Sequence, residues 1–362
     1  MRVNSMRRLA WLAGLLVLLS MVVLVFSKSR NAALEPLPAD QIELTKVVDG
    51  TTYALTKDGR LFRVNEATGK WYYEQTVLQL DEMQAAYLHE NGVVYRYDAE
   101  SNVRLPVRRN FSESFEGLET GVAGLRQMIG QERGWGALTL QSPKAREVSD
   151  YVRLRQRILA EKGDFLDAAI FPDDRHVRTG TRSLFFTSPP KPSNMVTCKA
   201  SVSSPLVYFE KGDTFCYRAS YYAEESLPFT VMDLECEWIK GHAGIRICIN
   251  ENGQIEGELK ALDKPRYRQT SSKPVSFPMG RWVQLQTQIQ LSNEQDGHIR
   301  IWQDGELLVD TDGVTLPMES AIYSSLEIGI SAHSYGSKVC KLWVDDIEVS
   351  DRPFELQSKT KP

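Results

Sequence analysis

The stretch Gln284–Leu291, QLQTQIQL, decides the fold class of this sequence. Gln stands at every even position, whereas Leu, Thr and Ile stand at the odd positions. Successive side chains of a β-strand point to opposite faces of the sheet, so this alternation predicts one buried and one solvated face. The stretch therefore predicts a strand of an antiparallel sheet that packs against a second layer.

Similar strand patterns cover most of the second half of the chain. Pairs such as Asn252-Gly253 and Asp296-Gly297 separate them, and these pairs are strong hairpin signals. So many strands predict an all-β, two-sheet sandwich. A helix is expected at 143–162, because Ser142-Pro143 is typical of a helix start and Gly163 of its end. The nine expected strands are 183–187, 214–223, 229–238, 244–250, 254–262, 282–291, 298–302, 326–332 and 339–349.

A smaller module precedes the sandwich. Thr52–Val64 and Ala86–Tyr97 are two hairpin patterns that turn at Asp58-Gly59 and Asn91-Gly92. They predict a small β-hairpin module, which acts as a spacer or docking unit or only packs on the next domain. We expect the chain to comprise a membrane segment at 1–30, a linker at 31–41, the hairpin module at 42–107, the sandwich at 108–352 and a tail at 353–362.

The N-terminus carries an apolar run without charge, Leu9–Phe26. As a helix it would be about 27 Å long, which matches the hydrocarbon core of a bilayer. Three Arg residues precede the run, which predicts a signal anchor with a cytoplasmic N-terminus and an extracytoplasmic remainder, periplasmic, luminal or at the cell surface. A cleaved signal peptide is the alternative.

Charge and cysteine content exclude several classes of protein. The chain holds 43 Lys and Arg against 47 Asp and Glu, a net charge of −4, which argues against a nucleic-acid partner. None of the five cysteines forms a CxxC pair, which excludes a zinc knuckle and a thioredoxin-like motif. They are expected to be small buried residues, or to form disulfides in an oxidising compartment.

Three segments carry a resemblance to a known fold family. They are Gly280–Val283, GRWV; Asp296–Gly305, DGHIRIWQDG; and Trp343–Ile347, WVDDI. Their order resembles the concanavalin A-like jelly roll of laminin-G-like modules and heparin-lyase-type polysaccharide lyases. The resemblance covers residues 110–352 and implies a two-sheet jelly roll. It implies little about activity, because lyases, glycosidases, lectins and adhesion domains share this fold.

In such jelly rolls, sugars lie across the concave face of one sheet, so the polar faces of strands supply the candidate residues. In Met232–Trp238, MDLECEW, Asp233, Glu235 and Glu237 share one face. Paired carboxylates are the groups that glycoside hydrolases use. The candidates for substrate binding are Arg218, Tyr222, Glu235, Glu237, Arg246 and Lys260.

A lyase that acts by β-elimination needs three functions. A cation or amide neutralises the uronate carboxyl group, a base takes the C5 proton, and an acid protonates the leaving oxygen. Tyr and His often fill the proton-transfer roles in lyases that share this fold. The candidates for the three functions together are Tyr267, Arg268 and His333.

The resemblance also implies a metal. Jelly-roll sugar-binding modules often hold a structural Ca²⁺ between the first and last strands. Glu116, Asp345 and Asp346 supply oxygen ligands at those places. The alternative is that the two aspartates only cap the edge of a hairpin.

Three hypotheses about function follow. The first is a membrane-anchored extracytoplasmic module that binds a polysaccharide without catalysis. The second is a polysaccharide lyase that acts on a uronate-containing glycan or, less favoured, a glycoside hydrolase. The third is a structural or protein-interaction ectodomain. The sequence does not specify the glycan or the oligomeric state.

Overall fold

The computed structural model describes most of the chain. The described residues are 33–34, 38–48, 51–56, 60–65, 68–76, 85–90, 93–98, 103–130, 133–236, 243–260, 265–319 and 321–355. They form two compact units, Met1–Val107 and Arg108–Pro362. The predicted membrane segment, Leu9–Phe26, lies outside the described residues. Among the helices that are described, none is both long and apolar enough to cross a bilayer.

The first unit consists of short antiparallel strands. The strands of both predicted hairpins pair, Thr52 with Val64 and Ala86 with Tyr97, whereas the predicted turns at Asp58-Gly59 and Asn91-Gly92 lie outside the described residues. Ala54, Phe62 and Trp71 form a small core on the larger sheet. That sheet has the order β1-β5-β4-β3-β2 (Ala33–Leu34, Lys70–Thr76, Arg60–Asn65, Thr51–Thr56, Ile42–Val48), and the second has the order β6-β7-β8 (Ala85–Glu90, Val93–Asp98, Val103–Pro106).

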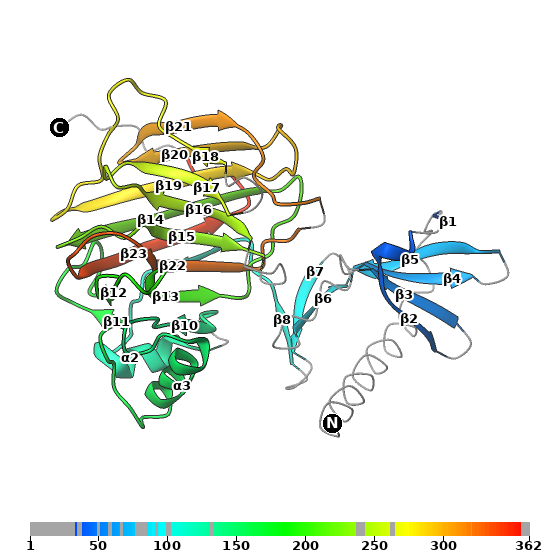
Figure 1. Cartoon of the computed structure of the whole chain (residues 1–362), viewed down its shortest axis with the longest axis horizontal. Helices are drawn as coiled ribbons and strands as arrows, with labels where there is room; N and C mark the ends of the chain where they lie inside the picture. The colour runs from blue at the N-terminus through cyan, green and yellow to red at the C-terminus, as the bar shows by residue number, and fades with distance from the viewer. Residues whose placement is uncertain are drawn as a thin grey trace. The chain divides into compact units, whose positions relative to one another are not determined.

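The second unit is a sandwich of two antiparallel sheets, as the alternation predicts (Figure 1). The seven-stranded sheet has the order β10-β13-β22-β15-β16-β17-β18 (Ala137–Thr139, Cys198–Ser204, Ser325–His333, Thr230–Glu235, Gly244–Ile249, Ile255–Leu259, Arg266–Tyr267). The eight-stranded sheet has the order β11-β12-β23-β14-β19-β20-β21 (Ala169–Asp173, Ser183–Ser188, Cys340–Ser350, Thr214–Glu224, Trp282–Gln290, His298–Gln303, Glu306–Asp312), and β9 (Phe111–Glu113) pairs with β23.

One large apolar core fills the space between the two sheets. In β19, Leu285 and Ile289 belong to this core, whereas Gln284 and Gln288 on the other face are half-exposed. The same alternation holds in β16, where Ile245 and Ile247 are core residues. Each sheet therefore has an inner, apolar face and an outer face that points away from the other sheet. The chemistry of the unit depends on these two outer faces.

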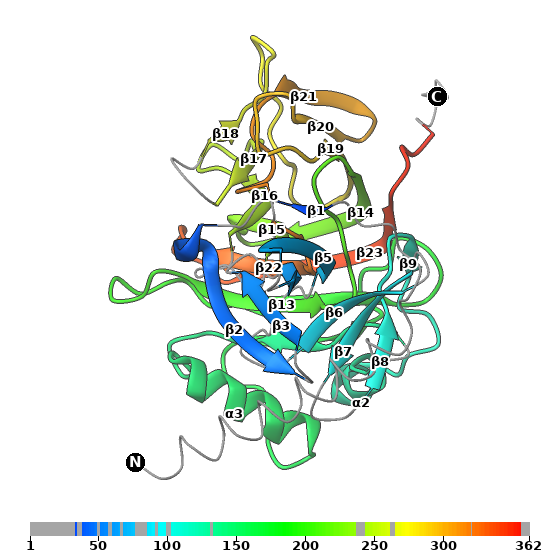
Figure 2. The ribbon, with the colours of Figure 1, turned by 90° about the vertical axis from the view of Figure 1, so that its right-hand side faces the viewer.

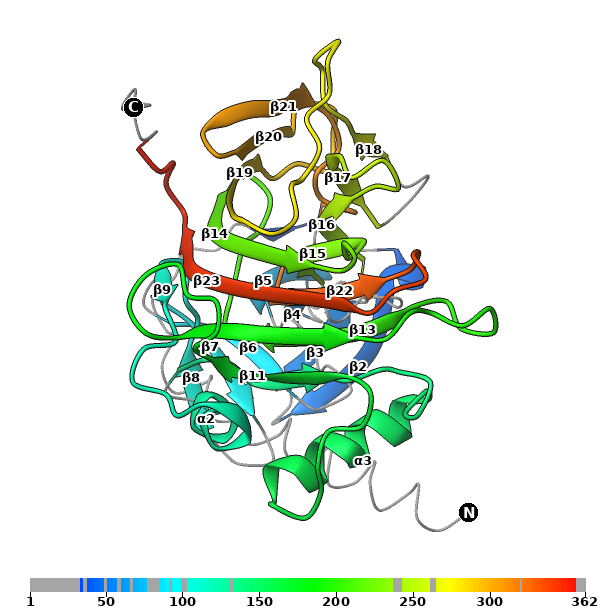
Figure 3. The same cartoon turned by 90° about the vertical axis from the view of Figure 1, so that its left-hand side faces the viewer.

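Two helices lie together at one end of the sandwich, and β18 and β21 lie at the opposite end (Figure 1, Figure 2 and Figure 3). Helix α2 spans Gly121–Met128 and α3 spans Val148–Leu159. The predicted start of α3 at Ser142-Pro143 is wrong. Glu147 caps the helix through a capping box with Asp150, and Ser142 instead exchanges backbone hydrogen bonds with Ala145.

All five cysteines are free and buried, which confirms the prediction that they are small buried residues. Burial raises the pKa of the Cys216 thiol to about 12 and that of Cys198 to about 11. These thiols therefore remain protonated and unreactive at neutral pH.

Candidate functional site

A polar pocket lies on the outer face of the seven-stranded sheet. Its volume is about 750 Å³, which is the size of a small-molecule site. Residues of β13, β22, β15 and β16 line it, together with Tyr151 of α3 and the segment Val196-Thr197. The lining side chains alternate along each strand with core residues, so the pocket is polar while the sheet beneath it is apolar on its other face.

Five charged side chains cross the sheet in a row, and three of them, Glu327, Asp233 and Arg246, line this pocket. Asp233 lies directly opposite Glu327 on one side and Arg246 on the other. Arg246 is opposite Glu258, which is opposite Arg266. Residues that are directly opposite on paired strands point to the same face of the sheet. We call Glu327, Asp233, Arg246, Glu258 and Arg266 the charged row.

Two lysines neutralise the acids of the pocket. Lys260 Nζ donates to Asp233 Oδ2 at 2.8 Å and also to Glu235 Oε1. Lys199 Nζ lies 3.6 Å from Glu327 Oε2. The hydroxyls of Ser201 and Ser331 donate to the same carboxylate of Glu327. The acids therefore hold two ammonium groups in fixed places on the outer face.

Burial and charge set the protonation states in the pocket. Burial, together with the nearby charges of Glu235 and Glu327, raises the pKa of Asp233 to about 7, although Lys260 opposes the rise. Burial alone would lower the pKa of Lys199, but the neighbouring carboxylates outweigh it and raise that pKa above its usual value. The lysine thus stays charged at neutral pH, whereas Asp233 titrates there.

The phenol of Tyr151 faces this pocket from α3. Burial raises its pKa, and the ammonium of Lys199 offsets part of that rise. The hydroxyl is therefore neutral at pH 7 and retains its proton. It is the one tyrosine among the described residues that line the pocket, and no described histidine lines it.

Three of the pocket's carboxylates lie close enough to hold one metal ion. Oxygens of Asp233, Glu235 and Glu327 all lie within 4.8 Å of one another. However, Lys260 donates to two of these carboxylates and Lys199 pairs with the third. The ammonium groups already supply the positive charge that a metal ion would bring, so the donor set does not fit a metal.

The carboxylates predicted to bind Ca²⁺ accept hydrogen bonds from the loop at residues 178–182. Glu116 accepts hydrogen bonds from the backbone N–H groups of Thr181 and Arg182, at 2.8 and 2.9 Å. Asp345 is fully buried and accepts from the N–H groups of Arg178 and Thr179, and Asp346 accepts from the Thr179 hydroxyl. These bonds give all three carboxylates partners within the protein, and the Ca²⁺ itself stays a prediction.

The predicted substrate-binding residues divide between the two sheets. Glu235, Arg246 and Lys260 line the pocket. Arg218 lies on β14 of the eight-stranded sheet, where it pairs with Glu348 and lines a different, smaller pocket. Glu237 lies outside the described residues.

Tyr222 also belongs to the eight-stranded sheet, where it is part of a row of aromatic rings on the outer face. Each ring lies opposite the next on neighbouring strands, in the order Phe171, Phe185, Trp343, Tyr222 and Trp282. Adjacent ring centroids are 4.7 to 5.7 Å apart. We call these five residues the aromatic row.

The three predicted catalytic residues are not brought together. Tyr267 is a core residue whose hydroxyl donates to the carbonyl of Val314. His333 is fully buried on β22, and its Nδ1 lies 2.9 Å from the carbonyl of Pro189. Burial lowers the pKa of His333, so its ring is neutral at pH 7. Arg268 is exposed, and only Arg268 of the three is on the outer face near the charged row, 3.8 Å from Glu256.

Sequence reasoning did not single out Lys199, Tyr151 and Glu327. Glu327 interrupts the apolar run of a predicted strand, which is a signal that it points to the other face. Lys199 lies on β13, whose sequence CKASVSS has small residues and a weak strand pattern. Nothing in the sequence places Tyr151 against these strands, because only the folding of the whole unit brings α3 next to the sheet.

A family model described as Polysaccharide lyase matches residues 130–348. No curated protein matches the chain. Among solved structures, an endo-β-1,4-glucuronan lyase from the fungus Trichoderma reesei is 14% identical, with a TM-score of 0.45, covering 67% of this chain and 95% of that chain. The alginate lyase Aly36B is 9% identical, with a TM-score of 0.36, covering 70% and 100%.

Proposed function

Because the chain belongs to the polysaccharide lyase family, we propose that it cleaves a uronate-containing polysaccharide by β-elimination in the pocket of the seven-stranded sheet. One observation carries the proposal. In this pocket Asp233 lies between Arg246, which is directly opposite it on one side, and Glu327, which holds Lys199 on the other, and its Oδ1 is buried without a hydrogen-bond partner. Removal of a proton next to a carboxyl group requires cations near that carboxyl group and a carboxylate that accepts the proton.

The reaction breaks two bonds of one uronate residue. The C5–H proton moves to the base, the C4–O bond to the leaving sugar breaks, and a C4=C5 double bond forms. The leaving oxygen takes a proton from the acid. Positive charge next to the substrate carboxyl group stabilises the negative charge that develops on it in the transition state.

Lys199 and Arg246 are the proposed groups for this charge stabilisation. Their side chains are 28% and 17% exposed, so each can reach a ligand while its position remains fixed. Lys199 is held by Glu327, and Arg246 by Glu258. Preorganised cations of this kind need little rearrangement during the reaction.

Asp233 is the proposed base and Tyr151 the proposed acid. A pKa of about 7 lets Asp233 be deprotonated and still accept a proton at neutral pH. Lys260 binds its Oδ2, and Oδ1 has no hydrogen-bond partner but is buried, so the side chain has to turn toward the pocket for Oδ1 to reach the substrate. The raised pKa of Tyr151 keeps its hydroxyl protonated, as the acid requires.

Membership of a lyase family favours catalysis over the first of the three hypotheses, a module that binds a polysaccharide without catalysis. A hydrolase that uses Glu235 is disfavoured as well, because Glu235 and Asp233 share the ammonium of Lys260. Two carboxylates held by one cation do not leave room for a sugar between them.

The test is a panel of uronate-containing and neutral polysaccharides. The expected result is a rise in the ultraviolet absorbance of unsaturated uronates with at least one uronate polymer, together with new reducing ends. New reducing ends without that absorbance would replace β-elimination by hydrolysis.

We also propose that Leu9–Phe26 anchors the chain in a membrane with the bulk of the protein outside the cytoplasm. The length of the apolar run and the preceding Arg residues support this. Full-length protein is expected in the membrane fraction after alkaline extraction, and a variant that begins at residue 32 is expected in the soluble fraction. Release of the full-length chain by alkali would contradict the anchor.

A further inference from the structure

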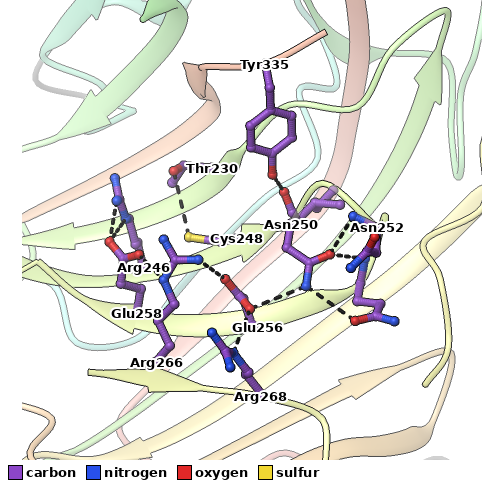
Figure 4. A network of polar contacts seen from close by, with 12 residues as sticks. Thr230, Arg246, Cys248, Asn250, Asn252, Glu256, Glu258, Arg266, Arg268 and Tyr335 are labelled. Carbon is purple, nitrogen blue, oxygen red and sulfur yellow. Dashed lines mark hydrogen bonds and ion pairs between the residues drawn. The ribbon is translucent and has the colours of Figure 1, made fainter. Parts of the chain in front are cut away.

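Beyond the pocket, the charges of the outer face continue to the edge of the seven-stranded sheet. Arg246, Arg266 and Arg268 alternate with the carboxylates of Glu258 and Glu256 (Figure 4). We call the three arginines with the two glutamates the arginine ladder. The proposed mechanism uses only Arg246 and Glu258, which holds it, so Arg266, Arg268 and Glu256 have no role in it.

The glutamates fix the arginines in place. Arg246 Nε donates to Glu258 Oε1 at 3.1 Å, and Arg266 Nε lies 2.9 Å from Glu258 Oε2. Arg266 Nη1 also donates to Glu256 Oε1 at 3.0 Å. Both glutamates are only 1% exposed. A guanidinium held in this way loses little conformational freedom when it binds an anion.

The exposure of the arginines increases away from the pocket. The side chains of Arg246, Arg266 and Arg268 are 17%, 40% and 73% exposed. Three guanidinium groups face two carboxylates, so one positive charge is in excess. Arg268 has a single long ion pair, 3.8 Å from Glu256, and therefore most of its hydrogen-bonding capacity is free for a ligand.

The ladder and the pocket form one continuous surface. The ring of Phe229 lines the pocket and lies 4.7 Å from the guanidinium of Arg246 and 5.9 Å from that of Arg266. From Asp233 on β15 to the edge strand β18 there are three strand intervals, about 14 Å at the usual spacing. A glycan that runs from Asp233 to Arg268 therefore spans several sugar rings.

We infer that Arg266 and Arg268 form a distal subsite that binds a uronate carboxylate of the substrate several residues away from the cleaved bond. The inference rests on the proposed function for the direction of the chain and for the nature of the substrate. It makes the enzyme selective for long polyuronates. A short oligosaccharide fills the pocket but does not reach the ladder.

The test compares Arg268→Ala with Arg352→Ala, a control arginine that is 90% exposed and has a similar long ion pair, 4.0 Å from Asp351. Binding of a uronate disaccharide and of a long oligouronate is measured by calorimetry in full-length protein that carries Asp233→Asn, so that the ligand is not consumed. Arg268→Ala is expected to weaken binding of the long ligand about three- to tenfold and to leave the disaccharide unchanged. Arg352→Ala is expected to change neither affinity.

Two results would overturn the distal subsite. One is an unchanged affinity of Arg268→Ala for the long ligand, and the other is an equal loss for both ligands. The outcome is separate from that of the proposed function. If the unmodified chain cleaves no uronate polymer but Arg268→Ala still weakens the long ligand selectively, the lyase proposal fails and the subsite stands. If the chain cleaves a uronate polymer and Arg268→Ala binds the long ligand with unchanged affinity, the lyase proposal stands and the distal subsite fails.

Discussion

The outer faces of the two sheets carry different side chains, a charged row on the seven-stranded sheet and an aromatic row on the eight-stranded sheet. The charged row crosses five strands of one sheet, and the aromatic row crosses five strands of the other. Both follow from the same alternation of core and outer residues along antiparallel strands. Three residues of the charged row line a pocket, whereas side chains of the loop that follows β11 pack on part of the aromatic row.

Two side chains of that loop pack on rings of the aromatic row. The His176 ring stacks on Tyr222 with centroids 4.1 Å apart, and the guanidinium of Arg175 lies 4.6 Å from the ring of Phe185. Trp343 is 1% exposed, and its Nε1 donates to the buried carboxylate of Asp173 at 2.6 Å. Phe185 and Trp343 are thus buried at the centre of the aromatic row, whereas Phe171, Tyr222 and Trp282 remain half-exposed. We therefore expect the aromatic row to contribute mainly to stability, and we propose activity for the charged row.

The largest effect is expected for Trp343→Ala, which removes the central ring of the aromatic row. Truncating a buried Trp costs about 3–5 kcal/mol of unfolding free energy, through lost contacts and a cavity. Denaturant unfolding followed by fluorescence measures the loss. Activity per folded molecule is expected to stay unchanged, and a strong loss of activity in the folded fraction would break the division between the faces.

Tyr151→Phe tests the proposed acid and is paired with Tyr222→Phe on the other face. Removing a proton donor lowers kcat by about 10²-fold, because general acid catalysis contributes factors of this size. Tyr222→Phe is expected to leave kcat unchanged. Steady-state kinetics on the preferred polymer measure both. Equal kinetics for the two variants would remove Tyr151 from the mechanism.

The pH dependence sharpens the role of Asp233. If it is the base, kcat/KM rises about tenfold per pH unit below pH 7 and levels off above it, since the base must be deprotonated. Stability runs the other way. The raised pKa of Asp233 in the folded state contributes stability below its ordinary pKa of 3.8, and this is lost as pH rises through about 7. A flat kcat/KM profile between pH 5 and 8 would contradict the assignment.

The smallest effect is expected for removal of divalent cations. Backbone N–H groups already satisfy Glu116 and Asp345. A chelator is therefore expected to shift the unfolding temperature by less than about 2 °C. Differential scanning fluorimetry with and without Ca²⁺ measures this, and a larger fall that Ca²⁺ reverses would restore the predicted calcium site.

The sequence predicted strands well where the alternation is strong. All nine expected strands are present, and Gln284–Leu291 orients as its pattern indicates. The strands that were missed are short or lack the pattern, as in β10, β11 and β18, or are made of small residues, as in β13. Helix α2 was also missed, since its eight residues carry two glycines.

The site was predictable only in part, because it depends on register and on contacts between distant segments. Alternation placed Glu235 and Arg246 on outward faces, but it did not tell which sheet each strand joins. Arg218 and Tyr222 therefore joined the candidate list although they belong to the other sheet. Tyr267 lies between two arginines, in a run whose residue types suit a lyase site. Its side chain nevertheless points into the core, because its neighbour Arg266 points outward.

The most direct test of the central claim compares two buried aspartates on the two outer faces. Asp233 is 2% exposed and Asp173 is 6% exposed, and each binds a cation. Initial rates of ultraviolet absorbance change on a uronate polymer are measured for Asp233→Asn and Asp173→Asn, corrected for the folded fraction. Asp233→Asn is expected to lower kcat/KM by about 10³-fold, and Asp173→Asn by less than about threefold. Equal losses, or a larger loss for Asp173→Asn, would contradict the assignment of catalysis to the charged row.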